Sequence, residues 1–283
     1  MTVQITDDEI QAFHDRGYLV LRDVFDKDEL AVMREEADRL LELVINSSLA
    51  NERTSGRLDL AADDGGTQYV RKVQPVNDLS RVIADVSSDE RFLDPMRTLL
   101  GDEPVLMEEK LNYKQRLPEP YPELDAERSS TAFAVHNDWA YYRQDGYPRS
   151  LIWSAVILDD CTKENGPIHV WPGSHVRHLP HQESANGLEI PPDEINHKGG
   201  ENVIAPAGSV LMFHSLLVHN SRHNDSGRPR RLLLYSHYPE SEFNTYFDER
   251  NGPTRYRESS WEGEYYRKKG NGKYEDRFAA PDV

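Results

Sequence analysis

The sequence predicts a mainly β fold, a sandwich or barrel with helices at its flanks. After Leu60 the chain breaks into short apolar or alternating runs separated by Gly, Pro, Asn and Asp, a pattern typical of strands joined by turns. Little helical periodicity lies between these runs, which disfavours a βαβ sheet. Clear helical patterns occur before residue 46, so the helices are expected to pack against the strands that follow.

Two helices are expected at the start of the chain. A capping-box pattern precedes each of them, formed by Thr6 with Glu9 and, in a looser version, by Asp26 with Glu29. The first helix is expected over 10–14. The second carries apolar residues at spacings of three and four, so one stripe should face a core. The run 18–21 between them predicts a strand.

The same reasoning predicts further strands and two long connections. The expected strands are 69–76, 105–113, 151–158, 168–171, 210–213 and 231–238. The connections 117–131 and 180–200 are long and polar, so each is interpreted as a lid or binding loop or as a plain surface insertion. A single domain over 1–283 is expected, with helices in about 6–46, a core in about 65–240 and a C-terminal extension in about 245–283, to which no function is assigned.

Composition limits the partners. Lys and Arg number 33 and Asp and Glu 50, a net charge of −17, which argues against nucleic acid or an anionic membrane as partner. Cys161 is the one cysteine, so no internal disulfide can form and a reducing compartment is expected. The start of the chain lacks a signal-peptide pattern, and no run approaches about 20 apolar residues. We expect a cytoplasmic monomer or homodimer; the acidity is interpreted as an ordinary solvated surface or, alternatively, as adaptation to a saline habitat.

A metal site is predicted from three residues. On an extended strand, residues two apart point to the same side, so His136 and Asp138 can reach one cation. His219, 83 residues further along the chain, supplies a second imidazole. Two histidines and a carboxylate leave adjacent positions open, as oxygen-activating Fe(II) requires to bind a bidentate co-substrate and O2. Zinc hydrolases use the same ligand types, so these residues alone do not identify the metal.

Arg230 distinguishes between these metals. It lies eleven residues after His219 and directly before an apolar strand. A buried guanidinium binds a carboxylate through two parallel hydrogen bonds, which suits the distal end of a dicarboxylate co-substrate and has no use in zinc hydrolysis. Arg228 and Arg231 are alternatives for the same role.

At these residues the chain resembles the phytanoyl-CoA dioxygenase family of Fe(II)/2-oxoglutarate oxygenases, including its ectoine hydroxylase branch. The similar fragments follow the family's order along the chain: Phe13-His-Asp-Arg-Gly-Tyr, Asn165-Gly-Pro, Trp171-Pro-Gly-Ser-His, and the spacing from His219 to Arg230. The resemblance implies a double-stranded β-helix, a cupin-like jelly roll of two facing sheets with N-terminal helices against one of them.

The resemblance also implies a reaction and its cofactors. Fe(II) would be held by His136, Asp138 and His219, and 2-oxoglutarate and O2 would be consumed to hydroxylate a small-molecule substrate with release of succinate and CO2. Related halogenases replace the carboxylate by a small residue, so Asp138 favours hydroxylation. By position in the family pattern, the 2-oxoglutarate site would contain Arg230, Ser221, Asn112, Lys114 and Phe133. The segment 117–131 is longer than in similar hydroxylases, which leaves the substrate wall unpredicted.

The substrate is predicted to be a small polar metabolite, such as an amino acid or an ectoine-like solute. Trp139, Tyr141 and Tyr142 follow the metal pair and are candidates to hold it by packing and cation–π contact, with core packing as the alternative. Further candidates are Arg143, Arg149 and Trp153. The net charge opposes an acyl-CoA unless a local basic patch exists. Alternatives are a secondary-metabolite or acyl-thioester substrate, or a cupin-like metal-dependent isomerase or binding protein, although the His-x-His motif of cupins is absent.

The other histidines are expected to be structural. His169, His175, His178 and His181 surround the Trp-Pro-Gly-Ser turn and are a conceivable second metal site, but their spacing alternates with Pro and Arg. His214 and His223 lie near His219 without the adjacent Glu of a zinc-binding helix, so they are expected beside the site at most.

Overall fold

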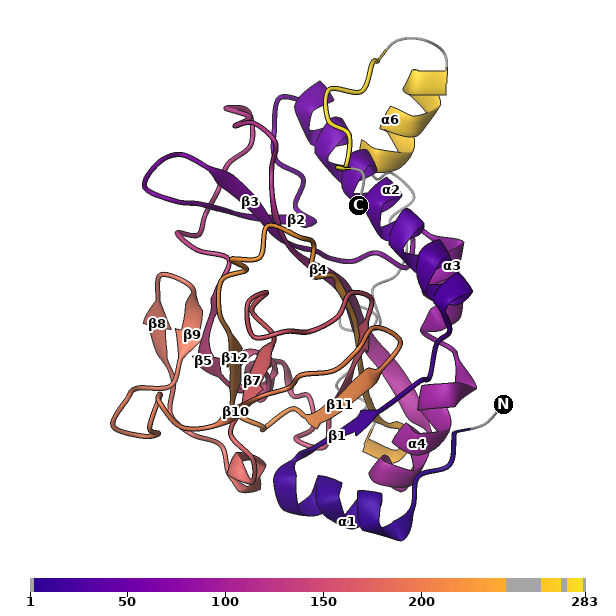
Figure 1. The fold of residues 1–283 in the computed structure, drawn as a ribbon, viewed down its shortest axis with the longest axis vertical. Helices are drawn as coiled ribbons and strands as arrows, with labels where there is room; N and C mark the ends of the chain where they lie inside the picture. Colours follow the sequence, from indigo (N-terminus) through magenta and orange to yellow (C-terminus); the bar gives the residue numbers. More distant parts are fainter. Residues whose placement is uncertain (1–2, 243–260, 271–273, 282–283) are drawn as a thin grey trace.

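The computed structural model describes residues 3–242, 261–270 and 274–281, and its strands form two main antiparallel sheets (Figure 1). The larger sheet has seven strands, in the order β1 (Tyr18–Leu21), β11 (Val210–His214), β6 (Ile152–Ile157), β13 (Leu232–Pro239), β4 (Pro104–Arg116), β3 (Gln68–Val73) and β2 (Leu58–Ala62). The smaller has four, β10 (Glu201–Asn202), β7 (Ile168–Val170), β12 (His219–Ser221) and β5 (Phe133–His136). A separate hairpin joins β8 (Gln182–Ser184) to β9 (Gly187–Glu189).

Both expected N-terminal helices are present and begin at the expected caps. The Thr6 hydroxyl accepts a hydrogen bond from the Glu9 N–H, and the Asp26 carboxylate accepts one from the Glu29 N–H, at 3.3 and 3.0 Å. α1 (Asp7–Arg16) is longer than expected because it starts directly after Thr6 and continues to Gly17, where φ is 82°. α2 (Lys27–Ala50) follows, and β1 has the expected bounds.

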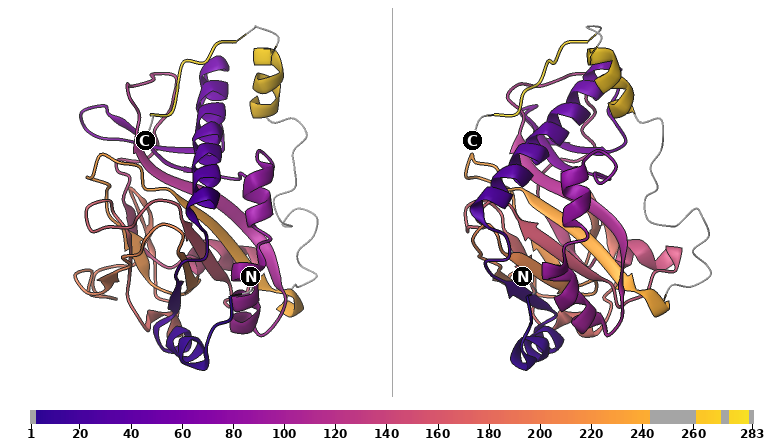
Figure 2. Two further views of the ribbon diagram at one scale, coloured as in Figure 1. Left: turned by 45° about the vertical axis from the view of Figure 1, so that its right-hand side comes forward. Right: turned by 90° about the vertical axis from the view of Figure 1, so that its right-hand side faces the viewer.

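Helices cover the outer face of the larger sheet, where α2 crosses the strands with α3 (Arg81–Val86) and α4 (Glu90–Leu100) beside it (Figure 2). On β13, Leu233 and Tyr235 belong to the core between the sheet and these helices. Leu232 and Leu234 alternate with them and belong to the core between the two sheets. Both faces of β13 are therefore covered, which explains the uninterrupted apolar run from Leu232 to Tyr235 at its start.

The expectation of little helix after Leu60 was wrong for the segment between β3 and β4. α3 and α4 lie there, and each begins at a side-chain cap, Ser80 on the Ile83 N–H and Asp89 on the Arg91 N–H. α3 has only 6 residues, too few for a recognisable apolar pattern. α4 has 11 residues and buries Phe92, Met96 and Leu99 at helical spacing, but it contains Pro95, which is unusual inside a helix. β2, the β8–β9 hairpin, β10 and β12 (His219–Ser221) were also not predicted. The six predicted strands after residue 60 are all present with slightly different ends.

The described part of the C-terminal extension packs on α2. Residues 245–260 lie outside the described residues, whereas α6 (Trp261–Gly270), which was not predicted, lies beside α2 in both views of Figure 2. The Asn46 side chain on α2 accepts a hydrogen bond from the Phe278 N–H and donates one to its carbonyl, at 2.9 and 2.8 Å. Phe278 itself is buried in the core under the helices. In the described part of the chain, no helix combines the length and apolar character that a membrane span needs.

Candidate active site

Three candidate metal ligands come together where β5 and β12 pair. His136 is the last residue of β5, and His219 is the first residue of β12. The antiparallel register places these two residues opposite each other, with ring centroids 4.4 Å apart. Asp138 follows at the start of α5 (Trp139–Tyr142), and one ligand atom from each of the three residues lies within 4.8 Å of the others. Within the described residues, this is the one cluster of metal-ligand type.

Hydrogen bonds orient both imidazole rings toward a common point. The Nδ1 of His136 lies 2.7 Å from the Ala134 carbonyl, and the Nδ1 of His219 lies 2.9 Å from the Leu217 carbonyl. A carbonyl can only accept, so each Nδ1 carries the proton and each Nε2 presents a lone pair. The two Nε2 atoms lie 3.4 and 3.7 Å from the carboxylate oxygens of Asp138. Three donor atoms therefore converge in the protonation states that a divalent cation needs.

Burial strengthens this arrangement. His136, Asp138 and His219 are each at most 8% exposed. Burial lowers the pKa of the His219 imidazole to about 4, which keeps the ring neutral at physiological pH. Burial alone would raise the pKa of the Asp138 carboxyl, but its interactions with His219 and His136 outweigh this effect and hold the pKa below its usual range. The carboxylate is therefore ionised when it meets a metal.

The expected geometric origin of the His-x-Asp pair was wrong. β5 ends at His136, and Asp138 has φ −66° and ψ −32°, in the right-handed helical region rather than on an extended strand. The partner strand β12 begins at His219, so no ladder continues past His136 and the chain turns there. Asp138 reaches the two imidazoles through this turn, not through the two-residue repeat of a strand.

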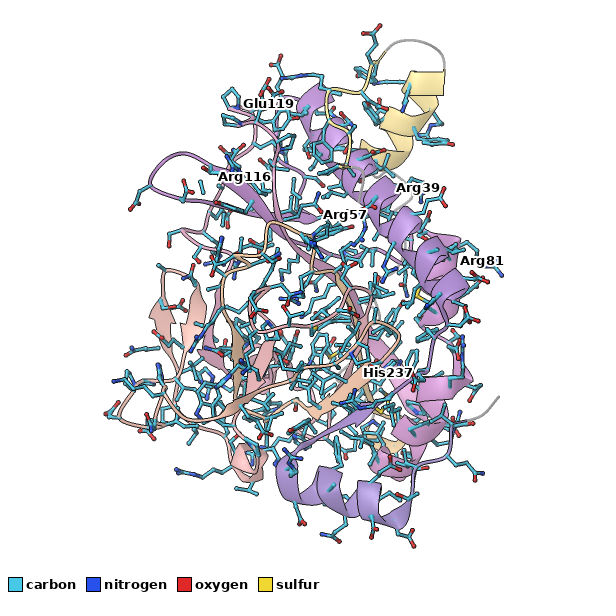
Figure 3. The ribbon with its side chains drawn as sticks, in the orientation of Figure 1. Arg39, Arg57, Arg81, Arg116, Glu119 and His237 are labelled. Atoms are coloured by element: carbon cyan, nitrogen blue, oxygen red, sulfur yellow. The ribbon has the colours of Figure 1, made fainter. Side chains whose placement is uncertain are left out.

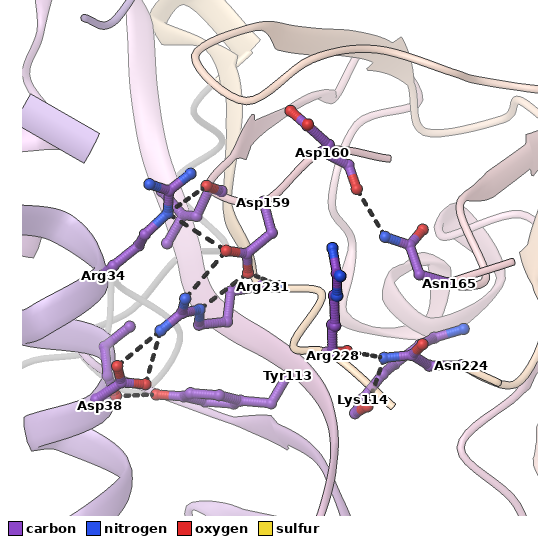
Figure 4. A network of polar contacts seen from close by, with 12 residues as sticks. Arg34, Asp38, Tyr113, Lys114, Asp159, Asp160, Asn165, Asn224, Arg228 and Arg231 are labelled. Atoms are coloured by element: carbon purple, nitrogen blue, oxygen red, sulfur yellow. Dashed lines mark hydrogen bonds and ion pairs between the residues drawn. The ribbon is translucent and has the colours of Figure 1, made fainter. Parts of the chain in front are cut away.

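Arg230 is the one of the three candidate arginines that lines the same cavity as the metal ligands. Its side chain is 1% exposed, and its Nε and Nη1 have no hydrogen-bond partner. Arg231 instead faces α2, where it donates to Asp38 and Asp159 at 2.7 and 2.9 Å (Figure 4). Arg228 is exposed. Arg230 therefore retains the free donors that a carboxylate ligand would take, which satisfies the chemical requirement of the 2-oxoglutarate site.

Three more of the expected co-substrate residues line this cavity, and one does not. Ser221, Asn112 and Phe133 are part of its wall, and the buried Oδ1 of Asn112 has no hydrogen-bond partner. Lys114 is buried beside the wall, with its ammonium group 5.7 Å from the centroid of the Phe133 ring, but it donates to the backbone carbonyls of Gly166 and Arg222. Lys114 thus supports the chain around the site without lining it.

Of the aromatic residues expected to bind the substrate, some line the cavity and others do not. Tyr141 and Tyr142 line the cavity, and the Tyr141 ring meets the His136 ring edge-on at 5.7 Å. Trp139 does not line it, because its indole N–H donates to the Tyr147 carbonyl and its ring lies under the Arg149 guanidinium. Trp153 is fully buried in the core between the sheets, and Arg143 also lies outside the cavity wall.

Most charged residues of the cavity were not singled out from the sequence. The cavity measures about 270 Å³, and its wall also contains Asp59, Arg71, Lys72, Glu108, Lys110 and Arg128. Charged residues on strands usually face solvent, so nothing in the local pattern distinguished these. Both long connections reach the cavity: Arg128 belongs to 117–131, and Asn186 and Gly187 belong to 180–200.

The remaining histidines have structural contacts. His181 accepts a hydrogen bond from the Asn137 N–H at 3.1 Å, and His178 contacts the Asn137 side chain at 3.3 Å. They therefore hold the residue between two metal ligands, a role that the sequence did not indicate. His214 accepts from the Leu216 N–H, while His223 bonds to the Thr131 hydroxyl. Neither belongs to the metal-ligand cluster.

The Cys161 thiol is buried, and burial raises its pKa to about 11.

Two imidazoles, one carboxylate and a free buried guanidinium in one cavity define the site of a 2-oxoglutarate-dependent non-haem iron dioxygenase. The model of the phytanoyl-CoA dioxygenase (PhyH) family matches residues 13–232, and the chain belongs to this family. Its cofactors are Fe(II) and 2-oxoglutarate.

Relatives of known function and a solved structure resemble the chain over most of its length. Ectoine dioxygenase from Sphingopyxis alaskensis is 29% identical over 247 residues, which cover 80% of this chain and 74% of the relative. L-proline trans-4-hydroxylase from Streptomyces griseoviridis is 26% identical over 61% of this chain and 68% of its own. The crystal structure of EctD from S. alaskensis with 2-oxoglutarate and 5-hydroxyectoine superposes with a TM-score of 0.65 at 24% identity, over 99% of this chain and 86% of that one.

Proposed function

We propose that the protein hydroxylates a small polar metabolite, such as an amino acid or an ectoine-like solute, and releases succinate and CO2 from 2-oxoglutarate. In this proposal His136, Asp138 and His219 hold Fe(II). Arg230 binds the distal carboxylate of 2-oxoglutarate, while Asn112, Ser221 and Phe133 form the wall around that co-substrate. Asp138 favours hydroxylation, because its carboxylate occupies the position that a halide would need.

One observation carries this proposal. The three metal-ligand side chains and the unpartnered guanidinium of Arg230 line one cavity of about 270 Å³. A buried guanidinium without a partner destabilises the fold. Its presence in this cavity is explained if an anionic ligand pairs with it when bound. A dicarboxylate that contacts both the metal and Arg230 meets that requirement.

The iron centre supplies oxygen activation when the metal and the co-substrate are bound. The chain's own residues position the reactants and control water. The Ala134 and Leu217 carbonyls hold the two imidazoles in the tautomer that presents Nε2. Phe133 and Phe213 provide apolar surface in the cavity wall, which limits the water that reaches the site.

The size of the cavity supports a small substrate. Its volume must accommodate 2-oxoglutarate as well as the substrate, which leaves little room for a nucleotide thioester. The relatives ectoine dioxygenase and L-proline trans-4-hydroxylase are likewise named for small metabolites. Membership of the dioxygenase family makes the cupin-like isomerase or binding protein the weaker alternative.

We further infer that the two sheets form a double-stranded β-helix within a single domain. Two observations support this fold. Residues between the sheets alternate with residues under the helices, as in β13, and the structure of EctD superposes over nearly the whole chain.

Succinate formation tests the proposal. Purified protein should release succinate from 2-oxoglutarate only when Fe(II) and O2 are both present, and the correct substrate should increase the rate. A screen of free amino acids, ectoine-like solutes, phosphonates and acyl thioesters identifies that substrate by mass spectrometry of the hydroxylated product. Oxidation of an acyl-CoA alone, with no turnover of any free metabolite, would contradict the proposed substrate class.

A further inference from the structure

Arg71 projects into the cavity because its strand is irregular at that position. In the pairing of β2 with β3, Asp59 lies opposite Lys72 and Leu60 lies opposite Val70, so Arg71 has no opposite residue. The register of β3 with β4 shifts at the same place. A bulge of this kind redirects side chains and is common beside active sites. As a result, the consecutive residues Arg71 and Lys72 both line the cavity.

The hydrogen-bonding capacity of Arg71 is incompletely used. Its side chain is 2% exposed, and its Nε has no partner. Its Nη1 lies at the long distances of 3.3 and 3.4 Å from the Asp59 carboxylate oxygens, and its Nη2 donates to the Ala132 carbonyl at 3.2 Å. The guanidinium stacks on the Phe133 ring, 4.3 Å from the centroid, which fixes its plane beside the proposed co-substrate site. Arg71 is therefore a rigid, buried cation with an unsatisfied donor.

Arg128 adds a second guanidinium of the same kind. It belongs to the connection 117–131, and its carbonyl accepts a hydrogen bond from the Ala62 N–H at 2.9 Å, which ties this point of the connection to β2. The side chain is half-buried, and its buried Nε has no partner. Burial lowers the pKa of Arg71, Asp59 opposes that change, and the nearby charge of Arg128 adds to it. The two guanidinium groups thus repel each other across the cavity wall.

The lysines of the cavity have closer partners than Arg71, whose ion pair with Asp59 spans 3.3 Å. Lys110 pairs with Glu108 at 3.1 Å, and Lys72 donates to Gln74 at 3.0 Å. If Arg230 takes the distal carboxylate of 2-oxoglutarate, Arg71 and Arg128 are the cavity arginines that still have a buried Nε donor without a partner for another ligand.

The charge of the cavity with Fe(II) and 2-oxoglutarate bound also favours an anionic ligand beside Arg71 and Arg128. Five cationic and three carboxylate side chains line it, a local excess of positive charge in a chain whose net charge is −17. Fe(II) and the 2-oxoglutarate dianion cancel each other in charge, so the excess remains after both bind. A low-dielectric cavity with this excess favours an anion over a neutral molecule of equal size.

We propose that Arg71 and Arg128 form an oxyanion subsite for the substrate, so that the substrate is a small acid whose carboxylate or phosphonate group lies between the two guanidinium groups. This inference rests on the proposed function and narrows its substrate class. The net negative charge of the whole chain opposes an anionic substrate. Within the cavity, however, the nearby positive side chains dominate the electrostatic interaction with a bound ligand. The bulge in β3 and the connection 117–131 together build the subsite.

Direct binding tests the subsite without turnover. The probes are N-acetylglycine, its phosphonate analogue N-acetyl-aminomethylphosphonate, and the neutral N-acetylglycinamide. They are titrated calorimetrically into protein loaded with Zn(II) in place of iron and saturated with 2-oxoglutarate. Both acids should bind at least about tenfold more tightly than the amide, as expected for charge-assisted hydrogen bonds. The acid that binds more tightly shows whether the subsite prefers a carboxylate or a phosphonate group.

Two variants and a control locate the effect. Arg71→Gln and Arg128→Gln should each reduce the preference for the acids by about tenfold, and Arg116→Gln, an exposed site at the end of β4, should not (Figure 3). Arg128 is half-buried with an unpartnered Nε, so its variant remains informative if Arg71→Gln fails to fold.

The inference is overturned if the wild-type protein shows no preference for the acids, or if Arg128→Gln retains the full preference. It is also overturned if acid binding weakens as 2-oxoglutarate increases, because the acids would then occupy the Arg230 site. Failure of the Zn(II)-loaded protein to bind 2-oxoglutarate at all would instead contradict the proposed function.

Discussion

Arg230 and Arg231 are adjacent in the sequence and face different sides of the larger sheet. Arg230 lines the cavity that contains the metal ligands, whereas Arg231 bonds to Asp38 on α2 and to Asp159. Under the proposed function, the Arg230 guanidinium binds the co-substrate, whereas the Arg231 guanidinium holds α2 against the sheet. Substitutions at these two positions should separate the two effects.

Replacing Arg230 by Leu should weaken 2-oxoglutarate binding by about 2–5 kcal/mol, the range for loss of one partner of a buried charge pair. Arg230→Lys should recover only part of the loss, because an ammonium group lacks the two-pronged geometry. Calorimetric titration of 2-oxoglutarate into the metal-loaded protein measures the change. Arg228→Leu at an exposed position is the control. An unchanged affinity in Arg230→Leu would assign the clamp to another residue.

Replacing Arg231 by Met should lower the free energy of unfolding by roughly 3 kcal/mol, because Asp38 and Asp159 would lose their buried partner. The folded fraction should still bind 2-oxoglutarate. Urea unfolding followed by circular dichroism measures the loss. If Arg231→Met unfolded at the wild-type urea concentration, the contacts with α2 would carry little of the stability.

Each of the changes His136→Ala, Asp138→Ala and His219→Ala should abolish tight Fe(II) binding and nearly all succinate formation, since two remaining donors hold the ion too weakly. Equilibrium dialysis measures the bound iron. His223→Ala is the matched control, because His223 lies four residues after His219 but outside the ligand cluster. Retained activity in His219→Ala would show that the metal has a different ligand set.

Glu109 should make the protein less stable as the pH rises. It is 4% exposed on β4, and burial raises its pKa to about 7, although backbone N–H groups of Asn77 and Val76 oppose the shift. The folded state therefore holds the proton that the unfolded state releases near pH 4.5. Below pH 4.5 the stabilisation is fully present. Between pH 4.5 and about pH 7 the free energy of unfolding falls by roughly 3 kcal/mol.

Glu109→Gln should remove this loss. Urea unfolding at pH 5 and pH 8 measures it, and Glu119→Gln at an exposed site should leave the wild-type difference intact (Figure 3). The same pH dependence in wild type and Glu109→Gln would mean that another group titrates.

The sequence alone determined the features that depend on neighbouring residues. The caps at Thr6 and Asp26, most strands of the larger sheet and the metal-ligand residue types could be predicted, because capping hydrogen bonds and side-chain periodicity act over a few residues. The resemblance of ordered motifs, from the Phe13 segment to Arg230, indicated the family correctly.

Tertiary structure alone decided which charged side chains enter the cavity. Arg71 lies there because strand register shifts around it, and Arg128 because a long connection pairs with β2. Trp139 and Lys114 are near the site in sequence, yet their polar groups donate to backbone carbonyls of other segments instead of entering the cavity. Register and loop placement depend on contacts between segments far apart in the chain, where the periodicity of one segment carries no information about the other.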